Sequence, residues 1–347
     1  MAFGYVDDHR FLLYQEGKAV QDITQWVGDP ALRDVLDALS LELTFQAARN
    51  DLRDKFMPWP GIRPGDKLRI VNHGLEAFSG VVLTVGLDGT VTANDMGWYP
   101  SKSQIILQVT NAAADDAIRQ MCAKAGIPVG IVPSLPTRIT ELWVGNTPSD
   151  ILNDILAVCS AETGRKYQVR VNGGRLNVAQ LPETPIVAYH KPAANLAAFD
   201  ITLAKGKVTG SDSMVDLYNS VLLAREDGDV AQVLGRAYNQ ESIRRYGLQQ
   251  LVERLDGDEN TAQARQRLKN LLAQNDRLTV ERQIDEIWGT DEVTSGTLIQ
   301  FQTNQYGVTG PQRVTEVTHY YKRGTMSLTV QDPAAGRAAG SADTINV

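Results

Sequence analysis

The chain has 347 residues and a mass of 38.0 kDa, and 43% of its residues are hydrophobic and 22% charged. A chain of this length can bury a large core without disulfides or metals, and it suggests two or three domains. Its net charge of -7 argues against a general nucleic-acid binder, which needs a basic face. The N-terminus lacks the pattern of a signal peptide, and no apolar stretch approaches the ~18 residues of a membrane span. We therefore expect that the chain does not insert into a membrane. We also expect that it is synthesised in a reducing cytoplasm.

Short alternating segments dominate the first part of the chain. Residues 39–45 (LSLELTF) carry an apolar side chain at every second position, as a half-buried strand does. A connection rich in Pro and Gly leads to KLRIVN, FSGVVLTVG and TVTAND, and the turn pair Asp88-Gly89 precedes the last of them. Such short strands separated by turn signals are typical of small antiparallel barrels and sandwiches. We interpret residues 1–105 as a first antiparallel β-barrel domain.

Helical spacing replaces this alternation after residue 111. A first apolar stripe has the spacing of one helix face and ends at a glycine that suits a C-terminal cap: Ile118, Met121, Cys122, Ala125 and Gly126. A second helix is predicted to begin with Thr147 as its cap, Pro148 at its first position and Asp150 in its first turn, and to stop at Gly164. Residues 167–171 and 176–178 flank a Gly-Gly turn and read as a hairpin. We interpret residues 106–185 as a small α/β module.

Alternation returns in the last part of the chain, where the strand order loosely repeats that of the first part. Residues 186–331 therefore predict a second, similar β-barrel domain, with a helical insertion at 240–275. Two apolar stripes suggest helices inside the insertion: Leu248, Leu251, Val252 and Leu255, then Ala264, Leu268, Leu271 and Leu272. The fold class is thus α+β and mainly β. Residues 332–347 form an Ala/Gly-rich extended tail that we expect only a neighbouring subunit or protein to order.

The histidines and cysteines suggest no site. His9, His73, His190 and His319 are not spaced like metal ligands, so a structural role is favoured for each. Both cysteines fall on predicted helix stripes, where a free thiol packs as a small apolar group: Cys122 and Cys159. We expect no disulfide framework, no metal and no reactive thiol.

Other catalytic patterns are also missing. The glycines form no phosphate-binding loop and no nucleophile elbow. The acidic residues are scattered, and sequence cannot show whether any two face each other across a sugar bond: Asp95, Asp212, Glu226 and Asp227. Trp143 and Tyr167 are the aromatic residues that a carbohydrate platform in the α/β module could use. We therefore expect no catalytic, cofactor-binding or metal-binding residues, and we expect the chain not to be an enzyme.

Several stretches together resemble one family. They are GIRPGDKLRIVN, FSGVV, TVTANDMGWYPSKSQ, AIRQMCAKAGIPVG, TPSDILNDILAVCSAETGRKYQVR, GGRLNV, ESIRRYGLQQLVE and GPQRVTEVTHYYKRGTMSLTVQD. In order and spacing, over residues 20–331, the chain resembles the baseplate hub of contractile phage tails, in the branch of PBSX-like prophages and phage-tail-like bacteriocins. It departs from the family pattern at the N-terminus, which lacks an arginine before the LELTF strand, and in the Ala/Gly-rich tail.

The resemblance implies a homotrimer that joins the hexameric tail tube to the three-fold central spike. Its partners would be the tail tube protein, the central spike protein and other baseplate proteins. Its place would be a virion or phage-tail-like particle, after synthesis in the host cytoplasm. Two alternatives stay open: a tail-associated peptidoglycan hydrolase, which would lyse purified cell wall, and a cell-wall-binding adaptor, which would bind glycans.

Overall fold

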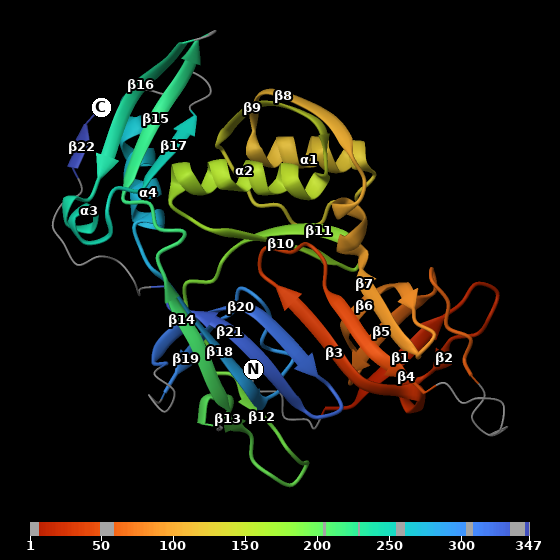
Figure 1. Cartoon of the computed structure of the whole chain (residues 1–347). Helices are drawn as coiled ribbons and strands as arrows, with labels where there is room; N and C mark the ends of the chain where they lie inside the picture. The colour runs from red at the N-terminus through yellow and green to blue at the C-terminus, as the bar shows by residue number, and fades with distance from the viewer. Residues whose placement is uncertain are drawn as a thin grey trace.

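The computed structural model describes residues 7–48, 59–203, 206–227, 230–254, 261–302, 308–333 and 344–346. Strands predominate, and the helices lie to one side of the largest sheet, in the upper half of Figure 1. Among the described residues, none of the helices is long and apolar enough to cross a membrane.

The N-terminal unit, residues 7–101, is a set of antiparallel strands. Alternating apolar residues face one core, in which Phe11, Phe45 and Phe78 are almost completely buried. Gly89 supplies the positive φ that the turn between β6 and β7 requires. The elements are β1 (His9–Tyr14), β2 (Gln21–Asp22), the 3₁₀ turn η1 (Thr24–Trp26), β3 (Val27–Val35), β4 (Glu42–Ala47), β5 (Lys67–Asn72), β6 (Leu75–Val85), β7 (Thr90–Asp95) and η2 (Met96–Ser101).

The C-terminal unit, residues 186–213 and 279–331, is also built from antiparallel strands. Its separate core contains Ile284, Val317 and Leu328, all fully buried. The elements are β12 (Tyr189–His190), β13 (Phe199–Asp200), η3 (Ile201–Leu203), β14 (Lys207–Ser213), β18 (Thr279–Trp288), β19 (Leu298–Phe301), β20 (Gly310–Tyr320) and β21 (Thr325–Gln331).

The two units share one sheet. Strand β3 pairs antiparallel with β20, from Ala31 opposite Tyr320 to Val35 opposite Glu316. The strands of the 12-stranded sheet follow the order β14-β18-β21-β20-β3-β4-β7-β6-β5-β1-β2, with β19 pairing to β20. Within the described residues this sheet is open. Two similar antiparallel β-barrel domains were expected; the mainly β class is confirmed, whereas the described strands do not close into two barrels.

The α/β module follows its predicted pattern. Its elements are β8 (Ile105–Ala113), α1 (Ala114–Ala125), β9 (Arg138–Asn146), α2 (Pro148–Thr163), β10 (Tyr167–Asn172) and β11 (Arg175–Gln180). Thr147 and Asp150 form a reciprocal capping box at the start of α2, and Gly126 and Gly164 end the helices in the left-handed conformation. The predicted helix boundaries and the 167–178 hairpin are therefore confirmed.

The described part of the predicted helical insertion, residues 240–275, contains two helices and one strand, and that strand belongs to a second, four-stranded sheet. The strand order is β17-β15-β16-β22, and α4 packs on one face (Figure 1). The elements are β15 (Ser220–Asp227), β16 (Val230–Tyr238), α3 (Gln240–Tyr246), β17 (Gln250–Arg254), α4 (Thr261–Asn275) and β22 (Thr344–Asn346). The helix with the stripe Ala264–Leu272 is confirmed as α4.

The prediction of a helix from Leu248 to Leu255 is wrong for the described part of this segment, which ends at residue 254. This segment is β17, which pairs in parallel with β15. Asn219 holds its entry: the side chain donates to the Gly247 carbonyl at 2.7 Å and accepts from the Gln249 N–H at 2.9 Å. Of the described residues in this stripe, Leu251 packs against the core under α4, while Leu248 and Val252 are exposed. Tertiary pairing therefore overrides the apparent helical period.

The end of the chain also differs from expectation. Thr344–Asn346 pair antiparallel with β16 of the same chain, while residues 334–343 lie outside the described residues. An edge strand offers unpaired backbone groups, so a short segment can bind it without large side chains. For these three residues, the expectation that only a neighbouring protein could order the tail is therefore wrong.

Candidate functional site

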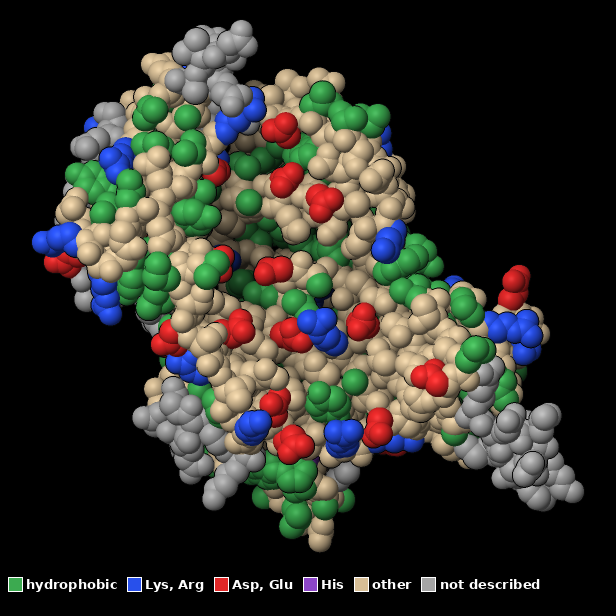
Figure 2. Space-filling model, in the orientation of Figure 1, with side chains coloured by type: hydrophobic (Ala, Val, Ile, Leu, Met, Phe, Trp, Pro, Cys, Tyr) green, Lys and Arg blue, Asp and Glu red, His purple; other side chains and the backbone are tan. Residues whose placement is uncertain are grey.

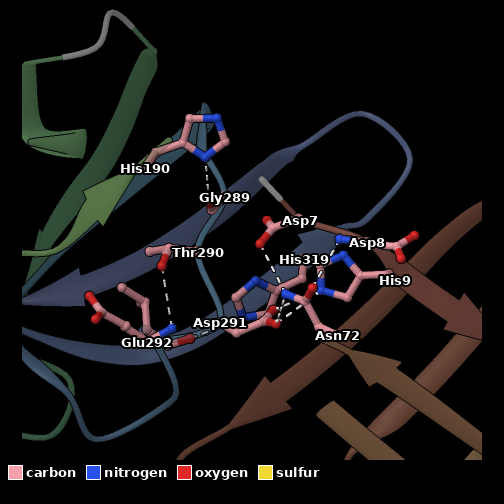
Figure 3. A network of polar contacts seen from close by, with 11 residues as sticks. Asp7, Asp8, His9, Asn72, His190, Gly289, Thr290, Asp291, Glu292 and His319 are labelled. Carbon is pink, nitrogen blue, oxygen red and sulfur yellow. Dashed lines mark hydrogen bonds and ion pairs between the residues drawn. The ribbon is translucent and has the colours of Figure 1, made fainter. Parts of the chain in front are cut away.

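A polar network joins the start of β1 to the loop after β18 (Figure 3). His9 Nε2 lies 3.0 and 3.1 Å from the two carboxylate oxygens of Asp291, so the ring N–H donates to that carboxylate. The His9 ring also packs on Tyr321, with the ring centres 4.0 Å apart. His9 and Asp291 are 282 residues apart in the sequence, and the network therefore connects the N-terminal unit to the C-terminal unit.

Asn72, at the end of β5, extends this network. Its Nδ2 donates to Asp7 Oδ1 and to Asp291 Oδ2, both at 2.9 Å, while its Oδ1 accepts from the Asp8 N–H at 2.9 Å. Burial alone would raise the pKa of Asp291, but the hydrogen bonds from His9 and Asn72 outweigh it and hold that pKa below its usual value. The Asp291 carboxylate is therefore ionised at neutral pH.

His319 lies beside this network in β20. Its Nε2 is 3.0 Å from the carbonyl oxygen of Val293, and its ring stacks on Tyr321. Burial lowers the pKa of His319, because the charged imidazolium would lose its hydration. The neutral ring thus fixes the loop after β18 against the sheet.

A buried ion pair joins three parts of the fold. Asp34 in β3 accepts from the backbone N–H of Ser295 at 2.9 Å and from its hydroxyl at 2.6 Å. Arg170 in β10 donates through Nη2 to Asp34 at 3.1 Å and to the Ser295 carbonyl at 2.6 Å. The N-terminal unit, the α/β module and the C-terminal unit therefore meet at one charged contact, which we call the Asp34 junction.

Asp95 is a second buried acid close to this junction. It caps η2 by accepting the Gly97 N–H at 2.9 Å. Burial raises the pKa of Asp95 to about 7, against the opposing effect of its hydrogen bonds. From the sequence, Asp95 is one of several acidic residues considered for a catalytic pair. In the structure its carboxylate instead caps η2.

A cleft of about 930 Å³ separates the α/β module from the sheet that α4 covers. Figure 2 shows this hollow with acidic side chains along its edge. It is lined by β9 and α2 on one side and by β17 and α4 on the other, where Arg267 pairs with Glu253 at 3.1 Å. A second cleft, of about 650 Å³, lies between α2 and the large sheet.

The other histidines and acidic residues named from the sequence do not come together in one site. His73 lies in a tight turn with a φ of 49°, and His190 is buried, with Nδ1 2.6 Å from the Gly289 carbonyl. Asp212 pairs with Arg282 across β14 and β18. Glu226 and Asp227 lie at the end of β15, where the side chains are outside the described set.

The cysteines and aromatic residues of the module have packing roles. Cys122 and Cys159 are fully buried in the module core, and burial raises the pKa of each thiol to about 11. Trp143 is 5% exposed and donates its indole N–H to Asp154 at 2.9 Å, while Tyr167 is half-buried against the same core. Neither aromatic ring offers an open platform for a sugar.

No sequence motif pointed to the group around Asp291. Among the described residues, Asp7, His9 and Asp291 have one ligand atom each within 4.8 Å of the others. Motif spacing could not reveal this, because the group forms only where the β3–β20 pairing joins the N-terminal unit to the C-terminal unit.

Comparison with known proteins gives a consistent result. A family model described as YQBQ-like matches residues 34–331. The chain is 25% identical over 296 residues to the phage-like element PBSX protein XkdQ of Bacillus subtilis, covering 84% of this chain and 86% of that protein.

Solved structures match along nearly the whole chain. A tail protein from Neisseria meningitidis superposes with a TM-score of 0.63 at 12% identity, covering 96% of this chain and 98% of that one. The 43 kDa tail protein of prophage MuSo2 from Shewanella oneidensis gives a TM-score of 0.60 at 12% identity, covering 94% and 98%. At this identity the matches establish a shared fold.

Proposed function

Because the chain belongs to the YQBQ-like family, we propose that it is a structural protein of a phage tail or phage-tail-like particle, and within it the baseplate hub. In this role it joins the hexameric tail tube to the three-fold central spike, and it acts by assembly rather than by catalysis. The observation that carries the proposal is the agreement over nearly full length with proteins named as tail proteins. The similarity to a phage-like element protein, over most of both chains, supports it independently.

The arrangement of the strands supports the hub role. Each chain carries two β units, one on either side of the β3–β20 pair. A trimer of such chains presents six β units, which can face a six-fold ring on one side while the trimer keeps three-fold symmetry on the other. A chain with one such unit would need a separate adaptor to make this change of symmetry.

The test is the copy number in the assembled particle. Particles carrying the chain are purified, and the baseplate is reconstructed by electron microscopy with the mass of the released hub complex measured in parallel. We expect three copies at the end of the tail tube, in contact with the tube protein and the spike. A monomer or dimer in the particle, or a position away from the tube axis, would overturn the hub role. Lysis of purified cell wall by the isolated chain would favour the hydrolase alternative instead.

A further inference from the structure

The N-terminal and C-terminal units together place three metal-ligating side chains around one point. Asp7 lies just before β1, His9 is its first residue, and Asp291 comes from the loop after β18 (Figure 3). One ligand atom of each lies within 4.8 Å of the other two. This convergence depends on the tertiary fold, since His9 and Asp291 are 282 residues apart.

The separation of His9 and Asp291 is close to that of two ligands of one ion. Ligands about 2.0–2.2 Å from a tetrahedral ion lie roughly 3.4 Å from one another. His9 Nε2 is already 3.0 Å from the nearer Asp291 oxygen, so a shift of a few tenths of an ångström would open the space between them. The ring is held in place by its packing on Tyr321, and its side chain is only 7% exposed. His9 and Asp291 are thus oriented before an ion arrives, and binding requires that the proton on His9 Nε2 leave that nitrogen.

Asn72 shows where the ion would lie. Its amide nitrogen donates to one oxygen of Asp7 and one of Asp291, at 2.9 Å each. The lone pairs of both carboxylates therefore converge on a single electropositive group. A cation placed there would replace the weak positive charge of the amide, and the Asn72 side chain would move aside. Because Asp7 lies at the surface, water could reach the remaining coordination position of the ion.

We propose that Asp7, His9 and Asp291 form a binding site for a divalent transition-metal ion of the Zn²⁺ class. Imidazole and carboxylate ligands together suit such ions, whereas Mg²⁺ and Ca²⁺ prefer six or more oxygen ligands. The bound ion would fasten the start of β1 to the C-terminal unit. It would add to the stability of the folded chain by mass action, because the unfolded chain does not bring the ligands together.

The experiment uses the purified full chain after treatment with a chelator and dialysis. We expect saturable binding of one Zn²⁺ per chain by calorimetry, and a rise in Tm of about 3–5 °C with Zn²⁺ in large excess over its Kd. Mg²⁺ at the same concentration should leave Tm unchanged. Co²⁺ should give the visible absorption of a bound ion with nitrogen and oxygen ligands.

The matched variants are Asp7→Asn and Asp8→Asn. Both residues are exposed and adjacent, but only Asp7 belongs to the ligand group. Asp7→Asn should fold normally and lose both the Zn²⁺ binding and the Tm rise, as should His9→Gln, while Asp8→Asn should keep both. Absence of saturable binding by the unmodified chain, or equal Zn²⁺ responses in the Asp7→Asn and Asp8→Asn variants, would overturn the proposal.

Discussion

Replacing Arg170 with methionine tests whether the Asp34 junction holds the fold together. The Asp34 side chain is 8% exposed and that of Arg170 is 22% exposed, so water screens this ion pair only weakly. Arg170→Met keeps most of the aliphatic volume but leaves the Asp34 carboxylate without its cation, and leaves the Ser295 carbonyl without its 2.6 Å hydrogen bond. Removing one partner of a buried pair costs about 3–5 kcal/mol. Because Asp34 keeps two hydrogen bonds from Ser295, we expect a loss near the lower end, about 3 kcal/mol.

The control lies one residue away from Asp34. Arg33 pairs with Glu316 at 2.6 Å and also connects β3 to β20, but its side chain is 51% exposed. Exposed pairs contribute about 0–1 kcal/mol, so Arg33→Met should lower stability by less than 1 kcal/mol. Thermal unfolding by calorimetry and urea unfolding by circular dichroism measure both variants, with Asp34→Asn and the double variant completing a thermodynamic cycle. A coupling of about 1–3 kcal/mol is expected, because the two side chains touch.

Equal losses of stability in Arg170→Met and Arg33→Met would contradict this prediction. They would mean that Asp34 is satisfied by Ser295 alone. Additive losses in the double variant would have the same meaning, because the energy would then not depend on the ion pair.

Three further predictions concern other buried groups and the tail. Cys122→Ser should lower stability by about 1–3 kcal/mol in thermal melts, because the new hydroxyl is buried. Cys159→Ser should cost less, because Thr137 can form a hydrogen bond with the serine hydroxyl at position 159. Equal losses in the two variants would contradict this. The pKa of the Asp95 carboxyl is 3.8 in the unfolded chain and about 7 in the folded chain. Between these pH values the folded chain holds a proton that the unfolded chain has released, so the folded state loses stability as the pH rises from about 4 to 7. Asp95→Asn should flatten the dependence of Tm on pH between about 4 and 7, and unchanged profiles would contradict it. Deleting residues 344–347 should leave Tm nearly unchanged, since β22 makes only a short edge contact, and should weaken assembly; a large drop in Tm would refute this.

Local signals made the α/β module predictable. Thr147 and Asp150 satisfy each other's backbone N–H groups within four residues, and Gly126 and Gly164 adopt left-handed conformations that few other residues accept. None of these interactions depends on a distant part of the chain. The sequence therefore specified where these helices begin and end.

The segment around Leu248 shows where local signals fail. Its apolar spacing fits a helix, but Asn219, about thirty residues earlier, binds the backbone at Gly247 and Gln249 and starts a parallel strand. The candidate site is invisible to sequence for the same reason. His9 and Asp291 belong to units that the β3–β20 pairing joins, and no spacing rule reports a contact between residues 282 positions apart.

The contacts between the two β units bear on the proposed hub. A ring made of three chains needs both units of each chain at a fixed separation, because an error in one chain displaces its neighbours. Three features oppose such an error here: the β3–β20 hydrogen bonds, the Asp34 junction and the His9–Asp291 contact. The backbone pairing fixes the register of the units, and the two polar contacts lie in separate places on the same loop after β18, so they resist rotation about the shared strands. The polar residues between the units thus fit a role in holding geometry, which is what a symmetry adaptor requires of its subunits.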